Sequence, residues 1–266
     1  MTARNLGGRR AGGFILAALF ILLCIGGTLA LADDRTDGVS PSNQWVDLYS
    51  IDSEFDGQLL QPGDVVAVFD PDGVQCGEFV VQTEGYYGLM PCYGDDSDTL
   101  VDEGAVTGDV LHFTVNGFAA QTTAITHNGV SVPGDTDIVW NQHGERWQVD
   151  LGASGAVSEP SIAIVDTGVE LSWDDVGGSV DHYEVWRSAT PYFSPGDTGS
   201  QRIADNVLPV PGGRVHFIDE DSNLGHPETN DYYLVRTIYT TGRASPSSPS
   251  TAAFDFALTP GASTTR

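Results

Sequence analysis

The densest polar segment of the chain is an acidic loop at residues 94–104, which carries five carboxylates between two glycines. Carboxylates crowded in this way repel one another unless they meet a cation or point apart into water. Ca²⁺ accepts about six to eight oxygen ligands and favours such side chains. The spacing indicates a structural Ca²⁺ site or, as the alternative, a solvated acidic loop. The candidate ligands are Asp95, Asp96, Asp98, Asp102 and Glu103. No other cofactor is indicated.

Two cysteines lie close together in the first half of the chain, at Cys76 and Cys92. In an oxidising compartment such a pair forms a disulfide, and the alternative is two buried thiols. A metal site that includes these two cysteines is not indicated, because the chain has no CxxC motif and His112 and His127 are scattered in the sequence.

Aromatic residues supply a second kind of candidate site. Ring faces exposed to solvent can stack on sugars or pack against partner proteins. Strand alternation buries one of each adjacent pair, so only some of these rings can be exposed. The candidate ligand-binding residues are Trp140, Tyr192 and Phe193.

Motifs of common enzyme classes are absent from the sequence. It has no HExxH, no GxSxG and no glycine-rich phosphate loop, and all 11 basic residues are arginine, so a lysine nucleophile or Schiff base is excluded. The adjacent acids Asp174 and Asp175 follow Trp173 and indicate a turn rather than the carboxylate pair of a glycosidase. We therefore expect a protein that is not an enzyme.

The elements that must hold these residues are strands. Short runs rich in Val, Ile, Tyr, Phe and Trp recur between Gly, Pro and Asp turns, and no window has a sustained helical period. The first half predicts strands at 45–50, 65–69, 77–82, 87–91, 110–115 and 147–151. The second half predicts seven, at 162–165, 169–173, 181–188, 201–204, 214–218, 231–239 and 252–256.

The order of these segments predicts an all-β protein with two tandem β-sandwich domains after an N-terminal signal or anchor helix. The expected divisions are a signal peptide at 1–32, a disordered leader at 33–42, a disulfide-bonded sandwich at 43–152, a linker at 153–160, a second sandwich at 161–257 and a flexible tail at 258–266. The short, small-residue linker predicts limited pivoting.

The second half resembles a fibronectin type III domain over about residues 158–256. The likeness lies in segments 171–173, 183–187 and 233–236, which match the B, C and F strands of that family. It implies that Trp173 is a core tryptophan, that Tyr183 and Val185 face inward, and that Tyr233 is a corner tyrosine whose hydroxyl caps the backbone. The aromatic stretch at 190–197 is longer than that family's usual connection.

The first half resembles small β-sandwich modules of bacterial surface proteins, of the prealbumin-like or immunoglobulin-like kind. The likeness covers roughly residues 43–120 and lies in segments 61–69, 84–89 and 108–115. It implies a stalk or adhesion role without catalytic residues.

The first 32 residues combine Arg4, Arg9 and Arg10 with an apolar run at 14–25 and small residues up to Ala32. This is the pattern of a cleaved signal peptide for general secretion. The alternative is an uncleaved anchor, because residues 13–32 are long enough to cross a bilayer with the arginines inside.

Charge narrows the range of partners. The chain has 11 basic and 37 acidic residues, a formal charge of −26, and cleavage after Ala32 would leave 8 against 37, or −29. We expect no nucleic-acid partner, and membrane contact only through residues 13–32 if they are retained.

Together these features predict a secreted or cell-surface protein, or alternatively a single-pass protein with its N-terminus inside. The expected function is non-catalytic and modular, in cell-surface adhesion, matrix or spacing, with an extracellular protein or polysaccharide as partner. The first alternative is a carbohydrate-binding module, and the second is an accessory region of a hydrolase.

Overall fold

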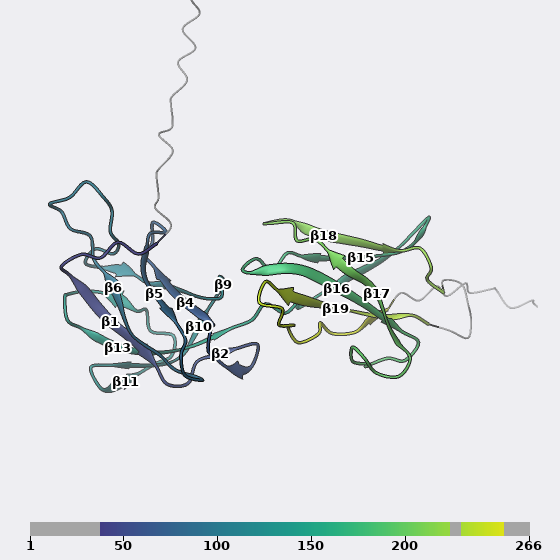
Figure 1. Cartoon of the computed structure of the whole chain (residues 1–266), viewed down its shortest axis with the longest axis horizontal. Helices are drawn as coiled ribbons and strands as arrows, with labels where there is room; N and C mark the ends of the chain where they lie inside the picture. Colours follow the sequence, from purple (N-terminus) through teal and green to yellow (C-terminus); the bar gives the residue numbers. More distant parts are fainter. Residues whose placement is uncertain (1–37, 224–229, 253–266) are drawn as a thin grey trace, which may run out of the picture. The chain divides into compact units, whose positions relative to one another are not determined.

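The computed structural model describes residues 38–223 and 230–252, and every regular element within them is a β-strand (Figure 1). The expected all-β architecture is confirmed for this part of the chain. The expected signal or anchor segment (1–32), the first half of the leader (33–37) and the tail (258–266) lie outside the described residues. None of the described residues belongs to a helix long and apolar enough to cross a membrane.

The first group of strands forms two larger sheets and one short ladder. One sheet has the order β11 (Val130–Val132), β10 (Gln121–His127), β13 (Arg146–Ala153), β1 (Trp45–Ser50) and β6 (Tyr87–Tyr93), with β2 (Glu54–Phe55) and β3 (Gln58–Leu59) added beside β13. The other has the order β5 (Gln75–Val80), β4 (Val65–Phe69), β8 (His112–Val115) and β9 (Phe118–Ala119). The ladder pairs β12 (Val139–Trp140) with β7 (Asp109–Val110).

Local patterns account for most of these strands. β1 alternates inward and outward along its whole length, and β4 follows a turn in which the Asp64 carboxylate accepts a hydrogen bond from the Gln61 amide at 2.7 Å. Both strands begin and end where the sequence predicts. β10 was not predicted, because only Ile125 of its seven residues is buried and the period-2 signal is therefore weak.

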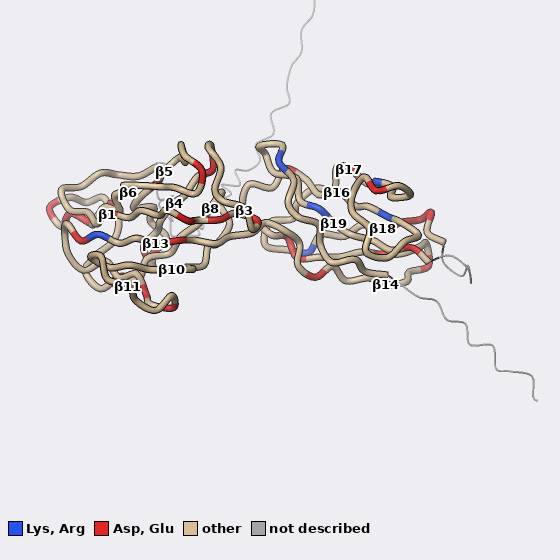
Figure 2. Tube along the Cα trace, turned by 90° about the horizontal axis from the view of Figure 1, so that it is seen from below, with Lys and Arg blue, Asp and Glu red and all other residues tan. Residues whose placement is uncertain are grey.

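Acidic residues are spread over both groups of strands, whereas the arginines are few (Figure 2). This distribution agrees with the strongly negative composition.

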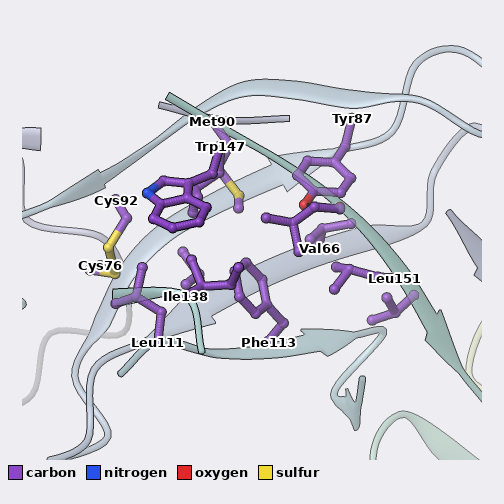
Figure 3. Close-up of a cluster of buried hydrophobic side chains, with 14 of the residues drawn as sticks. Val66, Cys76, Tyr87, Met90, Cys92, Leu111, Phe113, Ile138, Trp147 and Leu151 are labelled. Atoms are coloured by element: carbon purple, nitrogen blue, oxygen red, sulfur yellow. A yellow bond between two sulfur atoms is a disulfide. The ribbon is translucent and has the colours of Figure 1, made fainter. Parts of the chain in front are cut away.

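The core of the first group lies between its two larger sheets (Figure 3). Tyr87, Met90 and Leu151 are fully buried there, and Trp147 is nearly so. The Tyr87 hydroxyl donates a hydrogen bond to the Val149 carbonyl at 2.7 Å, so the polar end of this ring is satisfied inside the core.

The second group has a three-stranded and a four-stranded sheet. The first has the order β14 (Ser161–Val165), β15 (Gly168–Asp174) and β18 (Arg214–Asp219). The second has the order β17 (Ser200–Val207), β16 (Val180–Ser188), β19 (Tyr232–Tyr239) and β20 (Thr251–Ala252). All seven predicted strands are present, although the last is described only as far as Ala252.

The core of the second group is built around three aromatic residues. Trp173, Tyr183 and Tyr233 are each fully buried, and the rings of Trp173 and Tyr183 meet edge to face with centroids 5.4 Å apart. These three side chains therefore face the core, as the sequence predicts for Trp173 and Tyr183. The predicted role of the Tyr233 hydroxyl is wrong, because it donates to the Asp219 carboxylate at 2.9 Å instead of capping the backbone. Arg187 binds the same carboxylate and holds it in place.

The segment expected to be a pivoting linker is held by hydrogen bonds. β13 continues to Ala153, and Asp56 then accepts hydrogen bonds from the Ser154 hydroxyl at 2.8 Å and the Gly155 amide at 3.1 Å. The Gly155 carbonyl accepts a hydrogen bond from Thr237. Both the amide and the carbonyl of Gly155 are therefore hydrogen-bonded.

Candidate functional site

An open hollow of about 150 Å³ lies among the strands of the second group. Two of its residues come from the connection between β16 and β17, one begins β19, and two belong to the segment that forms β20. The lining residues are Pro191, Tyr192, Tyr232, Ser250 and Ala252. Tyr232 and Ala252 are direct cross-strand partners, so the sheet itself brings two sides of the hollow together.

Tyr192 is the most exposed aromatic side chain of the described residues, at 93%. Its neighbour Phe193 is 8% exposed, and the Asp197 carboxylate accepts a hydrogen bond from the Ser194 amide at 2.7 Å. The loop is thus anchored immediately after the exposed ring. The loop therefore presents one large ring to water, in the kind of segment that often carries binding residues.

The backbone of Tyr192 has φ = 57°, in the left-handed region that bulky residues rarely adopt. A conformation of this kind costs about 1–3 kcal/mol and persists only where the surroundings enforce it. Burial of Phe193 and the Asp197 turn supply that enforcement. The strain is consistent with a ring that is placed for binding rather than for packing.

Ser250 contributes a polar group to the hollow. Its hydroxyl oxygen is buried and has no hydrogen-bond partner among the described residues. A buried hydroxyl without a partner costs free energy, roughly 1–3 kcal/mol. The hollow therefore combines an exposed ring with an unsatisfied hydroxyl.

The other two predicted ligand-binding residues lie inside the protein. Trp140 is 3% exposed, and its indole nitrogen donates to the Cys92 carbonyl at 3.2 Å. Phe193 is buried as the anchor of its loop. Neither ring presents a face to solvent, which corrects the expectation of stacking surfaces at these two positions. Only Tyr192 of the three lines the hollow.

Sequence reasoning missed the rest of the lining. Tyr232 immediately precedes the core residue Tyr233, so strand alternation could have placed it on the outer face. Ser250 gave no signal, because it lies in a stretch of serines and prolines whose side-chain directions depend on the paired strand.

The predicted calcium loop is closed largely by its own hydrogen bonds. The buried Glu103 carboxylate accepts from the Thr99 hydroxyl at 2.6 Å and from the Asp96 amide at 3.0 Å. These bonds hold the pKa of Glu103 below its usual value. The Asp96 carboxylate accepts from the Asp98 amide at 3.0 Å. Two of the five candidate ligands are therefore already occupied within the loop.

Two other acids of this loop experience a different environment. Desolvation, followed by the negative charge of Asp102, raises the pKa of Asp95. Desolvation also raises the pKa of Asp102, and the charges of Asp70 and Asp72 add to the effect. Within residues 38–223 and 230–252, no three acidic, histidine or cysteine side chains are arranged to hold a metal ion. The five predicted ligands are thus not assembled into a coordination sphere.

The predicted disulfide between Cys76 and Cys92 is confirmed. It connects β5 with β6, which are edge strands of the two larger sheets of the first group (Figure 3). A Cβ atom at the neighbouring Gly77 would lie 2.3 Å from the Pro91 carbonyl oxygen, so only glycine permits this close approach of the two strands.

Comparison with known proteins gives no family assignment. No protein-family model and no curated protein matches the chain. Among solved structures, the pectate lyase Pel3 of Pectobacterium carotovorum is 26% identical over 35% of this chain and 26% of its own, with a TM-score of 0.25. The chain thus spans about a quarter of that enzyme.

Two further similar structures come from Bacteroides species. A DUF3823 family protein of Bacteroides ovatus is 10% identical, with 78% of this chain and 97% of its own covered and a TM-score of 0.30. A Bacteroides uniformis protein assigned provisionally to carbohydrate binding is 9% identical, with 78% and 98% covered and a TM-score of 0.27. Scores this low carry no inference about function, which must come from the site.

Proposed function

We propose that this chain is an exported, non-catalytic modular protein that binds the carbohydrate of an extracellular polymer through the hollow beside Tyr192. The observation that carries the proposal is the 93% exposure of this ring at the rim of the hollow. An apolar ring held out into water gains free energy when a ligand covers it. The broader role in surface adhesion, matrix or spacing follows if that polymer belongs to a cell surface or matrix.

The exposed ring of Tyr192 suits a sugar. One face of a pyranose ring presents mainly C–H groups and can pack on the flat face of Tyr192. The hollow is small, so one site holds one sugar unit weakly. A polymer compensates because its repeated units can occupy the sites of several protein molecules at the same time.

The lining favours binding over turnover. Pro191, Tyr192, Tyr232, Ser250 and Ala252 include no carboxylate and no imidazole. Hydrolysis of a glycosidic bond ordinarily requires a pair of carboxylates on either side of it. Among the described residues, a ligand in this hollow would contact rings, hydroxyl-bearing side chains and the Ala252 methyl group, which supports a role without catalysis.

The compartment and the modular build fit the same proposal. A disulfide is stable in oxidising, extracytoplasmic surroundings, in agreement with the signal or anchor pattern of residues 1–32. We propose a fibronectin type III-like module for the second group of strands and a prealbumin-like or immunoglobulin-like module for the first. Modules of this kind carry binding functions in their loops, where Tyr192 lies.

Affinity measurements on the purified chain test the proposal. We expect saturable, weak binding to at least one polysaccharide, and a loss of at least about fivefold in Tyr192→Ala, the effect of roughly 1 kcal/mol of ring contact. Tyr86→Ala removes another exposed tyrosine, 38% accessible and far from the hollow in sequence, and should leave affinity unchanged. Equal binding by wild type and Tyr192→Ala would refute the proposed site.

A further inference from the structure

The sequence contains two asparagine residues that are followed by glycine, Asn116 and Asn128. This dipeptide is prone to deamidation, because glycine has no side chain to hinder attack by its backbone nitrogen on the asparagine amide. Each pair forms the two-residue turn of a β-hairpin, with φ angles of 53° and 80° in the first and 49° and 81° in the second. The two turns thus have similar backbones and differ in their surroundings.

The first turn is held by contacts with another strand. The Asn116 side chain accepts a hydrogen bond from the Val65 amide at 2.9 Å and donates one to the Asp64 carboxylate at 2.9 Å. The flanking residues Val115 and Phe118 are cross-strand partners and are buried in the core. Rotation of this side chain, or opening of this turn, would break hydrogen bonds and expose apolar side chains.

The second turn lies at the edge of its sheet. It joins β10 to β11, which forms three residue pairs with β10 and is the last strand of the sheet among the described residues. Asn128 is exposed, and Val130 after the turn is 67% exposed. A short edge hairpin with few buried apolar contacts opens at a low cost in free energy. The Asn128 side chain should therefore reach the geometry of ring closure more often than that of Asn116.

A histidine lies beside the Asn128 amide. Asn128 Nδ2 donates a hydrogen bond to His127 Nε2 at 3.1 Å. The imidazole stacks on the buried indole of Trp147, with ring centroids 3.7 Å apart, and its Nε2 lies 3.8 Å from Glu145 Oε2. His127 is also the cross-strand partner of Trp147 on β13, so it keeps its place when β11 separates from β10. Histidine exchanges protons near neutral pH and is a common general acid.

From these observations we infer that Asn128 is a site of spontaneous deamidation in the folded protein and that Asn116 is protected. The Gly129 nitrogen loses its proton to solvent and forms a bond with Asn128 Cγ. The bond between Cγ and Nδ2 breaks, and Nδ2 leaves as ammonia with a proton that the His127 imidazolium donates. Water then opens the cyclic imide at either carbonyl, which yields aspartate or isoaspartate. The net reaction consumes one water molecule and releases one ammonia molecule.

The modification changes the hairpin in two ways. Either product places a new carboxylate beside His127, on the same imidazole that Glu145 approaches. Isoaspartate also adds a methylene group to the main chain, and a two-residue turn sets the register of its strands. Deamidation should therefore weaken the pairing of β11 with β10 as the protein ages.

The test is incubation of the purified full chain at neutral pH, followed by digestion and mass spectrometry of the peptides that contain each asparagine. A sample digested without incubation corrects for deamidation during digestion. We expect Asn128 to react at least about tenfold faster than Asn116, a difference of roughly 1.4 kcal/mol in activation free energy. In concentrated urea both sets of contacts are lost, so the two rates should agree within about threefold.

A variant tests the role of the imidazole. His127→Gln should slow deamidation of Asn128 in the folded chain about fivefold and leave its rate in urea nearly unchanged. His216→Gln, on β18 in the second group, is the matched control and should change neither rate. Hydrogen exchange of the β10 and β11 amides checks that the variants keep the hairpin as closed as in the wild type.

The possible outcomes separate the site from its catalyst. Equal rates at the two asparagines of the folded chain, or no product at Asn128 while the chain in urea reacts, would overturn the inference. A tenfold difference that persists in urea would also overturn it, because the sequence and not the fold would then select Asn128. A folded-chain rate that His127→Gln leaves unchanged or raises would overturn the role of the imidazole and leave the site standing.

Discussion

At the scale of single residues, Glu184 on β16 is a heavily hydrogen-bonded acid. It is 4% exposed and accepts hydrogen bonds from Arg202 at 2.6 Å, Arg236 at 2.6 Å and the Trp186 indole nitrogen at 3.0 Å. Burial alone would raise the pKa of Glu184, but these hydrogen bonds and the arginine charges outweigh it and lower the pKa below its usual value. The charged form is therefore favoured in the folded state.

The lowered pKa of Glu184 predicts that the Glu184→Gln variant is less stable than the wild type, by an amount that depends on pH. At pH 7 we expect a loss of roughly 1–3 kcal/mol, because two charge-assisted hydrogen bonds are weakened. The wild-type advantage exists above the unfolded pKa of glutamate, about 4.3, and is lost as the pH falls through the lowered folded pKa. Urea unfolding at pH 7 and at steps below pH 5 measures the difference.

The matched control is Glu170→Gln, which removes a half-buried acid paired with His216 at 3.0 Å on the other sheet. It should cost much less at pH 7, because exposed pairs contribute little. A difference between wild type and Glu184→Gln that stays constant down to pH 3 would contradict the assignment of a lowered pKa.

At the scale of elements, the disulfide stabilises the meeting of two sheet edges. β5 ends one sheet and β6 ends the other, and the bond between Cys76 and Cys92 links them across a separation of 16 residues. The chain-entropy account of such a crosslink assigns it about 3 kcal/mol through restriction of the unfolded state. Edge strands joined in this way are also less available for pairing with other chains.

We expect the double variant Cys76→Ser, Cys92→Ser to fold with a free energy of unfolding about 3 kcal/mol lower than that of the wild type. Urea unfolding in the absence and presence of reductant measures this value. Reductant should lower the stability of the wild type to that of the variant and leave the variant unchanged. A loss below about 1 kcal/mol, or a variant that still responds to reductant, would contradict the proposed contribution.

Strand β19 contributes residues to the hydrophobic cores of both groups of strands. Tyr233 and Val235 belong to the cluster of the second group, whereas Tyr239 belongs to that of the first, where its ring lies 5.3 Å from Phe55. The Tyr239 hydroxyl donates to Asp56 at 2.6 Å. One strand thus carries residues whose burial depends on segments far apart in the sequence.

At the scale of the whole molecule, excess negative charge is the dominant electrostatic feature, as Figure 2 shows for the described residues. Acids that repel one another favour expansion of the chain, and dissolved salt screens that repulsion. Desolvation is the main cause of the raised pKa values of Asp95 and Asp102, and repulsion from neighbouring acids adds to it. Stability should therefore depend on ionic strength more than on any single cation.

Thermal unfolding at pH 7 should shift to higher temperature as NaCl increases from low to physiological concentration. CaCl₂ at the same ionic strength should give a similar shift, since the described residues hold no assembled set of metal ligands. A clearly larger shift in CaCl₂ that is lost in Asp96→Asn, Asp98→Asn would reinstate the acidic loop as a calcium site.

Much of this architecture follows from local patterns. Alternation in β1, the turn before β4 and the positions of Trp173, Tyr183 and Tyr233 could be predicted, because a strand with one buried face shows its period in the sequence. The pairing of Cys76 with Cys92 could be predicted from their number and separation. β10 could not, since its exposed threonines give no such period.

The candidate site, in contrast, depends mainly on tertiary structure and little on local sequence patterns. Tyr192 could be singled out as an aromatic residue in a long loop, but the burial of Trp140 and Phe193 and the presence of Ser250 beside Tyr192 could not be predicted. Exposure of a ring and the hydrogen bonding of a hydroxyl are set by residues that the sheets bring together from β16, β19 and β20. Local pattern decides which residues form strands, whereas only strand pairing in three dimensions decides which side chains share a hollow.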